Sequence, residues 1–318
     1  MSERVFERRA SRIGAVLRSA ALCMAVTCAV AGRAAPSPAE AAASGGDAAA
    51  TPTRPELRWL TDAPLLGAGV SLLAVGGAMS TATRFVPPTG LDRGQVHWSF
   101  DRAQIGNHDT RANDQSDYTL SAATAYPLAV AFAFQPSGTR ASGTLRRSAV
   151  YTEAVLIAEG ICSVIKKSAG RPRPYTYLPV GQRPGDPGYD VTKSDAFQSM
   201  PSGHSTGAFC GAAFAMTDNL LSRPQAGWLE RAGVPFAGGV LAGMTAAMRV
   251  EAGKHFPSDV IVGGSIGTAC GVAVPLVHHY LGAHGRRAPL PSGRAWGQAA
   301  VGLFAGVGTG ILIAQASH

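Results

Sequence analysis

Three short polar stretches carry the side chains in this sequence that are best suited to chemistry on an anion. They are KKSAGRPRPY with Lys166, Arg171 and Arg173, QSMPSGHSTGAF with Ser202, Gly203 and His204, and MRVEAGKHFPSD with Arg249, His255 and Asp259. Lysine and arginine bind phosphate oxygens, and a neutral, oriented imidazole near fixed positive charge is a nucleophile for phosphorus. The three stretches together therefore predict a site for phosphoryl transfer.

The stretch from Pro201 to His204 lies directly before an apolar segment. The N–H groups and the dipole of the helix predicted there would point to one spot and could hold an anion. A serine–histidine hydrolase is a competing interpretation of Ser202 and His204. It is disfavoured because the two residues are near neighbours in the chain and no G-x-S-x-G turn surrounds them.

The third stretch predicts an oriented histidine. Pro257 suits the first turn of a helix, with Asp259 in the same turn and His255 just before it. We expect Asp259 to accept a hydrogen bond from one ring nitrogen of His255, which leaves the other nitrogen free. The isolated histidines of the C-terminal third, His278, His279 and His284, are interpreted as structural.

The elements that must position these residues are apolar and rich in small side chains, which favours closely packed helices. Apolar segments lie near 64–82, 119–134, 148–165, 205–221, 232–248, 258–281 and 295–314. Each is about long enough to cross a membrane, which takes roughly 20 residues, although Glu153 and Glu159 interrupt the third. The predicted fold is an all-α bundle of about six core helices, embedded in a membrane, with its active site at helix ends on the outer face. The polar segment between the first two, around residues 91–120, is expected to form an external loop or short surface helices.

Arginines indicate an orientation for these segments. They concentrate in three loops, with Arg140, Arg146 and Arg147 in the first, Arg223 and Arg231 in the second, and Arg286, Arg287 and Arg294 in the third. The positive-inside rule makes these loops cytoplasmic and places the three polar stretches outside.

The N-terminal region conflicts with this orientation. Residues 1–31 combine arginines, a short apolar run and an A-x-A site, which is typical of a signal or anchor segment, and residues 32–56 read as a disordered linker. Residue 57 would then start outside. Either 64–82 lies on or re-enters the membrane, or the N-terminal stretch is no true signal. Residues 57–318 are predicted to form the helical domain.

The composition limits the kinds of molecule that the protein is expected to bind. The 318-residue chain has a formal net charge of +8, which favours phosphates or anionic lipid. Nucleic acid is disfavoured because no basic stripe with interleaved aromatics is present. The five cysteines form no CxxC pair and predict no zinc or redox motif.

The motifs resemble those of the superfamily of type 2 phosphatidic acid phosphatases, bacterial acid phosphatases and vanadium haloperoxidases. That signature is K-x6-R-P, P-S-G-H and S-R-x5-H-x3-D. This chain has Lys166-x6-Arg173-Pro174, Pro201-Ser202-Gly203-His204 and Arg249-x5-His255-x3-Asp259 in the same order. Met248 stands where the signature has serine, which puts one minor contact in doubt. The motifs span residues 166–259, and the helical pattern extends the likeness to roughly 57–285.

The resemblance implies a role for each matched residue. His255 would attack phosphorus and form a phosphohistidine, oriented by Asp259, while His204 would protonate the leaving oxygen and then activate water. The phosphate oxygens would be held by Lys166, Arg173, Ser202, Gly203 and Arg249. No carboxylate cluster suggests Mg²⁺, so neither a metal nor another cofactor is expected.

The function expected first is a metal-independent membrane phosphatase that acts on lipid phosphates or diphosphates at the periplasmic or outer face, with no protein partner inferred. A soluble periplasmic or secreted acid phosphatase with broad substrates is the alternative. A vanadium-dependent haloperoxidase is a weaker one because such chains are usually much longer. A binding protein without catalysis is weakest, since nucleophile, orienting acid and proton donor are all present.

Overall fold

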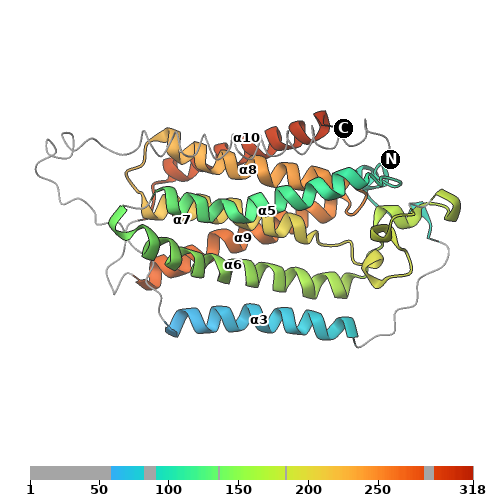
Figure 1. The fold of residues 1–318 in the computed structure, drawn as a ribbon, viewed down its shortest axis with the longest axis horizontal. Coiled ribbons are helices and arrows are strands. Elements are labelled where there is room, and N and C mark those ends of the chain that lie inside the picture. Colours follow the sequence, from blue (N-terminus) through green and yellow to red (C-terminus); the bar gives the residue numbers. More distant parts are fainter. Residues whose placement is uncertain (1–58, 82–90, 135–136, 183–184, 283–289, 318) are drawn as a thin grey trace, which may run out of the picture.

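The computed structural model describes residues 59–81, 91–134, 137–182, 185–282 and 290–317, and every regular element in these ranges is helical. The all-α prediction is therefore confirmed. Seven long helices lie side by side in an elongated bundle (Figure 1). They are α3 (Trp59–Thr81), α5 (Thr110–Ala133), α6 (Arg140–Ala169), α7 (Gly203–Ser222), α8 (Trp228–Glu251), α9 (Pro257–Gly282) and α10 (Gly293–Ala316). They correspond one to one with the seven predicted apolar segments.

Some predictions lie outside the described residues. These are the signal-like segment 1–31, the linker 32–56, and His284, Arg286 and Arg287.

Helix α7 lies at the centre of the bundle, and nearly all of its residues are buried. One apolar cluster packs α7 against α5, α8 and α10, with Tyr126, Met216 and Leu241 among its members. A second cluster packs α7 against α6 and α9 through Tyr151 and Phe214. Because α7 contacts both groups of helices, it fixes where the motif residues at its start lie.

Glycines set the distance between α7 and α9. Gly263, Gly267 and Gly271 follow one another at intervals of four, so they share one face of α9. A Cβ at Gly267 would collide with the carbonyl of Thr206, and the other two glycines meet the backbone of α7 in the same way. This close approach places the start of α9 directly beside the start of α7.

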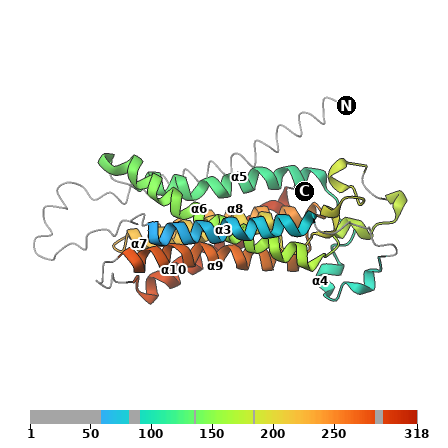
Figure 2. The ribbon, with the colours of Figure 1, turned by 90° about the horizontal axis from the view of Figure 1, so that it is seen from below.

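Helices α3 and α10 flank the bundle. Helix α10 packs on α8, and α3 packs mainly on α6 (Figure 2). Gly69 lies against Leu156 and Gly76 against Ser163, so α3 and α6 run parallel. Helix α10 contributes to the first apolar cluster and α3 to neither cluster, so six helices form the core, in agreement with the expected number.

The polar segment before α5 differs in part from its prediction. Residues 91–109 do form loops and short helices, including α4 (Ser99–Arg102), but residues 110–120 belong to the long helix α5. The side chain of Asp109 caps this helix by accepting from the N–H groups of Arg111 and Ala112. Burial of Ala112 and Ser116 then holds the polar first turns in the bundle.

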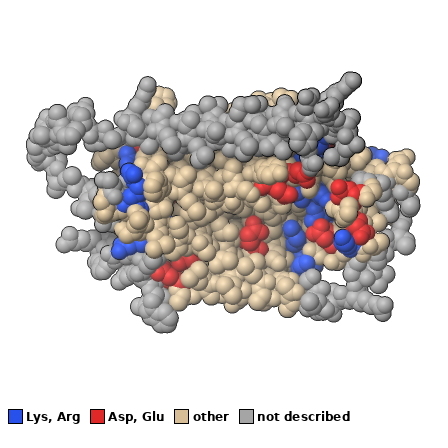
Figure 3. Space-filling view, in the orientation of Figure 1, with Lys and Arg blue, Asp and Glu red and all other residues tan. Residues whose placement is uncertain are grey.

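Five described helices are long and apolar enough to cross a membrane: α3, α6, α8, α9 and α10. Helix α10 also exposes large apolar side chains, with Val301, Phe304 and Leu312 67–73% exposed. Figure 3 shows Lys and Arg gathered at the end where α6 begins, charges of both signs at the opposite end, and a mostly uncharged band between. This distribution is typical of a protein that spans a bilayer.

Candidate active site

The three motif stretches meet at one end of the bundle. Helices α6 and α8 end there and α7 and α9 begin there, at the right in Figure 1. Backbone hydrogen bonds join the stretches: the Ser199 N–H donates to the Arg171 carbonyl, and the Ser202 N–H donates to the Asp259 carbonyl, at 2.9 and 3.0 Å. Residues separated by almost a hundred positions in the sequence therefore form one site.

His255 is held in a single tautomer. Its Nδ1 lies 2.6 Å from the carbonyl oxygen of Ser199. Because a carbonyl only accepts, Nδ1 carries the proton and Nε2 keeps its lone pair. The residue is 1% exposed, and burial, followed by the positive charges of Arg173, Arg249 and Lys166, lowers its pKa well below the ordinary value. The ring is therefore neutral at pH 7, with a free Nε2 among three cations.

Asp259 does not make the hydrogen bond predicted for it. Its Oδ2 lies 4.0 Å from Nδ1 of His255, since the Ser199 carbonyl occupies that position. The carboxylate instead accepts from the Ser199 hydroxyl at 2.5 Å, the Phe256 N–H at 2.8 Å and Arg171 Nη1 at 2.5 Å. Asp259 thus holds both segments that flank the histidine, and its effect on His255 runs through Ser199.

The cations come from three elements. Arg173 donates to the backbone and side chain of Asp195, at 2.9 and 2.8 Å, and to the Lys254 carbonyl at 3.3 Å. Arg249 Nη1 donates to Asn113 Oδ1 and Ser116 Oγ, at 3.0 and 3.1 Å, while its buried Nε has no partner in the described part of the chain. These bonds leave several guanidinium N–H groups for a ligand.

Lys166 and the start of α7 complete a set of anion-binding groups, called the cradle below, that also includes Arg173 and Arg249. A Cβ on Gly203 would lie 3.5 Å from Lys166 Nζ, so the amine lies close to the first residue of α7. The Ser202 hydroxyl accepts from the Ser205 N–H and hydroxyl, which leaves its own proton available. The first N–H groups of α7 have no partner within the helix. The site therefore combines positive side chains with a helix N-terminus, an arrangement suited to an oxyanion.

His204 makes a hydrogen bond that the sequence did not reveal. Its Nε2 lies 2.6 Å from Oδ1 of Asp117, on α5, and the imidazole is a quarter exposed. Burial and the charge of Arg249 lower the pKa of His204, whereas Asp117 opposes this shift. Asp117 belongs to no motif stretch, and only its helical spacing from Asn113 could have indicated that it faces the site.

A second network missed by the sequence analysis supports the start of α9. Arg171 joins Asp259 to Asp101 of α4, which lies 2.9 Å from Arg171 Nη2 and is completely buried. Asp101 also accepts from the N–H and hydroxyl of Ser258, at 3.0 and 2.5 Å. Arg171, to which the family resemblance gives no role, therefore has a structural one.

Met248 takes no part in the hydrogen-bond networks of the site. It is fully buried, and its sulfur lies 3.9 Å from the Thr119 hydroxyl in the α5–α8 interface. Arg249 receives its hydroxyl contact from Ser116 instead. The absent motif serine therefore does not leave Arg249 without such a contact.

One family model matches the part of the chain that carries the motifs. Residues 148–283 match the family model described as the PAP2 superfamily, and this range contains all three motifs. The match covers less than half of the chain and agrees with the resemblance carried by the motifs.

One curated relative is lipid A 1-phosphatase of Rhizobium johnstonii, which is 37% identical over 109 residues. The match covers 34% of this chain and 38% of that relative. No solved structure gives a significant match.

Proposed function

We propose that this protein is a membrane phosphatase that removes phosphate from lipid phosphomonoesters or diphosphates through a phosphohistidine. The observation that carries the proposal is the bond from His255 Nδ1 to the Ser199 carbonyl. It leaves Nε2 as a neutral nucleophile beside three cations. Phosphoryl transfer depends above all on such positioning and charge stabilisation.

The reaction has two steps. Nε2 of His255 attacks phosphorus while the bond to the leaving oxygen breaks, and His204 gives that oxygen its proton. His204 then takes a proton from water, whose oxygen attacks phosphorus and displaces His255 as free imidazole, releasing inorganic phosphate. Lys166, Arg173 and Arg249 hold the equatorial oxygens, and Asp117 supports the charged form of His204. Side chains of this site supply every group that the two steps require.

Three features favour a lipid over a water-soluble substrate. The apolar outer surface of the bundle keeps the site at a membrane interface, and the relative is named for dephosphorylating lipid A. A groove of about 730 Å³ also opens at this end, lined by Trp98, Phe100, Ile261 and Val262 among others, and beside Arg171. A groove with these apolar side chains suits the acyl chain of a lipid substrate.

The distribution of arginines among the loops supports the proposed orientation in the membrane. With α6 starting on the cytoplasmic side, the cradle faces the periplasm or the outside. Helix α3 runs parallel to α6, so Trp59 starts on the same side as Arg140. A spanning α3 is then incompatible with a cleaved N-terminal signal, and of the two explanations for the conflict we favour the one in which residues 1–31 are no true signal.

The test uses the full chain in detergent, with phosphate release measured on phosphatidic acid, lipid A and p-nitrophenyl phosphate. His255→Ala is expected to abolish turnover, whereas the control His279→Ala retains it. Rapid quench with labelled substrate should trap an acid-labile, base-stable adduct in the wild type. Full turnover without an adduct would indicate direct attack by water. Preference for p-nitrophenyl phosphate, with the protein in the soluble fraction, would indicate the soluble acid phosphatase instead.

A further inference from the structure

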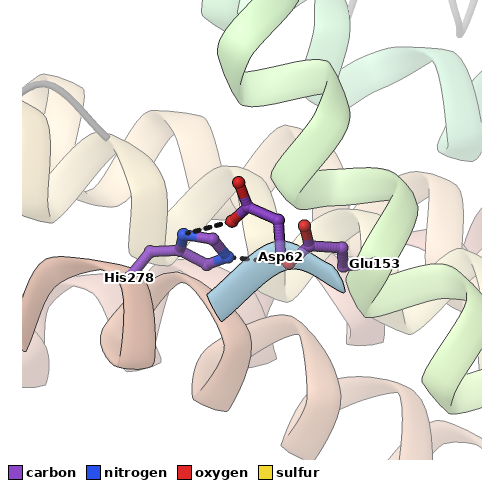
Figure 4. Close-up of side chains that lie close together, drawn as sticks. All are labelled: Asp62, Glu153 and His278. Carbon is purple, nitrogen blue, oxygen red and sulfur yellow. Dashed lines mark hydrogen bonds and ion pairs between the residues drawn. The ribbon is translucent and has the colours of Figure 1, made fainter. Parts of the chain in front are cut away.

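Three ionisable side chains meet far from the cradle, near the opposite end of the bundle. Asp62 lies in the first turn of α3, Glu153 on α6 and His278 near the end of α9 (Figure 4). His278 lies 21 residues beyond Pro257 along α9, which corresponds to about 30 Å at 1.5 Å per residue. The proposed catalysis uses none of the three, so they need a separate explanation.

The cluster is buried in an apolar part of the bundle. Glu153 is 0% and His278 3% exposed, and the Asp62 side chain is 14% exposed. His278 Nε2 lies 2.7 Å from Glu153 Oε2, and Nδ1 lies 3.6 Å from Asp62 Oδ1. Two carboxylates here face a single imidazole, and a buried negative charge is costly unless a cation compensates it.

Glu153 also has an oxygen without a partner. Its Oε1 is buried and accepts no hydrogen bond from any described residue. None of the ion pairs in the described ranges joins a lysine or arginine to Glu153 or Asp62. The cluster therefore has both the charge and the open oxygen that a positive ion would satisfy.

We infer that Asp62, Glu153 and His278 bind a divalent transition-metal ion, best fitted by Zn²⁺. One ligand atom from each residue lies within 4.8 Å of the others. Tetrahedral zinc ligands are about 3.3 Å apart for metal–ligand bonds of about 2.0 Å, so the ligand atoms would have to close in by up to about 1.5 Å. The His278 ring would also turn, because its two nitrogens now face different carboxylates. The mixture of imidazole and carboxylates favours zinc over Mg²⁺ and Ca²⁺, which prefer oxygen alone. A water molecule would supply the fourth ligand.

The ion would tie α3 to α9, with which α3 otherwise makes few contacts. Helix α3 packs mainly on α6, and both meet through small residues such as Gly69 and Gly160. A metal bound to Asp62, Glu153 and His278 ties α3 to both α6 and α9. The site is therefore structural, and its loss lowers thermal stability and the attachment of α3 without changing the chemistry at His255.

The experiment uses tag-free, full-length protein in detergent, stripped with a chelator and titrated with Zn²⁺ and separately with Co²⁺. After the titration and removal of excess metal, the wild type is expected to retain one Zn²⁺ per chain by elemental analysis. It is also expected to show Co²⁺ d–d absorption when loaded with cobalt, and to unfold at a higher temperature with metal than without. Glu153→Gln and His278→Gln weaken the affinity by more than about a hundredfold, the upper end of the loss typical of outer-sphere changes. His279→Gln, on the same helix, retains wild-type affinity.

Other results would overturn the assignment. They are a folded wild type with no stoichiometric ion, and variants at 153 and 278 that elute as folded protein but bind like the wild type. Should either variant fail to fold, X-ray absorption of the zinc-loaded wild type decides the question. One imidazole with only oxygen ligands supports the site, whereas sulfur or several imidazoles would place the metal elsewhere.

Discussion

Replacement of Asp259 by asparagine tests how His255 is positioned. The amide introduced by Asp259→Asn can present its oxygen to Ser199 and Phe256, or to Arg171, but its NH₂ group then opposes a donor on the other side. At least one charge-assisted hydrogen bond is lost, which is worth about 1.5–3 kcal/mol.

The effect on catalysis follows from this value. The Ser199 carbonyl still fixes the proton on Nδ1, so the tautomer of His255 is unchanged. At about 1.36 kcal/mol per factor of ten, kcat is expected to fall by about 10- to 150-fold. The free energy of unfolding falls by about 1.5–3 kcal/mol, because the same bond is lost from the folded state.

Two assays check this prediction. Single-turnover formation of the labelled phosphohistidine reports the chemical step, and denaturant unfolding in detergent reports stability. Asp92→Asn, at an exposed cap where asparagine serves equally well, is the matched control. A fall of about 10⁴ in kcat for a folded Asp259→Asn protein would refute the reasoning, because a loss of that size is typical of a wrong tautomer.

Three further predictions concern pH, inhibition and topology. Since the pKa values of His255 and His204 are both lowered, both rings are mostly neutral near pH 7, and acid raises the protonated share of His204 that its role as donor requires. The value of kcat/KM should therefore rise as the pH is lowered from about 7.5 to about 5.5, and Asp117→Asn should shift this rise to lower pH. A fall of kcat/KM on acidification over this range would contradict the assignment. Vanadate should inhibit more tightly than phosphate, and Arg249→Lys should weaken inhibition by vanadate more than inhibition by phosphate. Brief EDTA treatment should leave most of the activity. A loss of activity that Mg²⁺ reverses would contradict the roles given to the cations. A cysteine placed at Lys193 should react with an impermeant thiol reagent on intact cells and one at Ser142 only after permeabilisation, whereas labelling of both would indicate a soluble exported enzyme.

The sequence by itself determined the helices and indicated which motif residues form the candidate site. Seven apolar segments predicted seven helices because small and apolar residues over such lengths have few other ways to satisfy their backbone. The motifs around Lys166, His204 and His255 could be recognised because phosphoryl transfer requires those residue types, and each motif is contiguous in the chain. Local signals of this kind need no knowledge of the packing.

Only the tertiary structure decided which side chains meet across helices. Asp117 reaches His204 from α5, Ser199 replaces Asp259 as the partner of the His255 ring, and Glu153 meets His278 across 125 positions of sequence. Each contact depends on how two helices are rotated and how far one slides along the other. Packing of glycines and apolar side chains sets both quantities, and no local pattern in either helix encodes them.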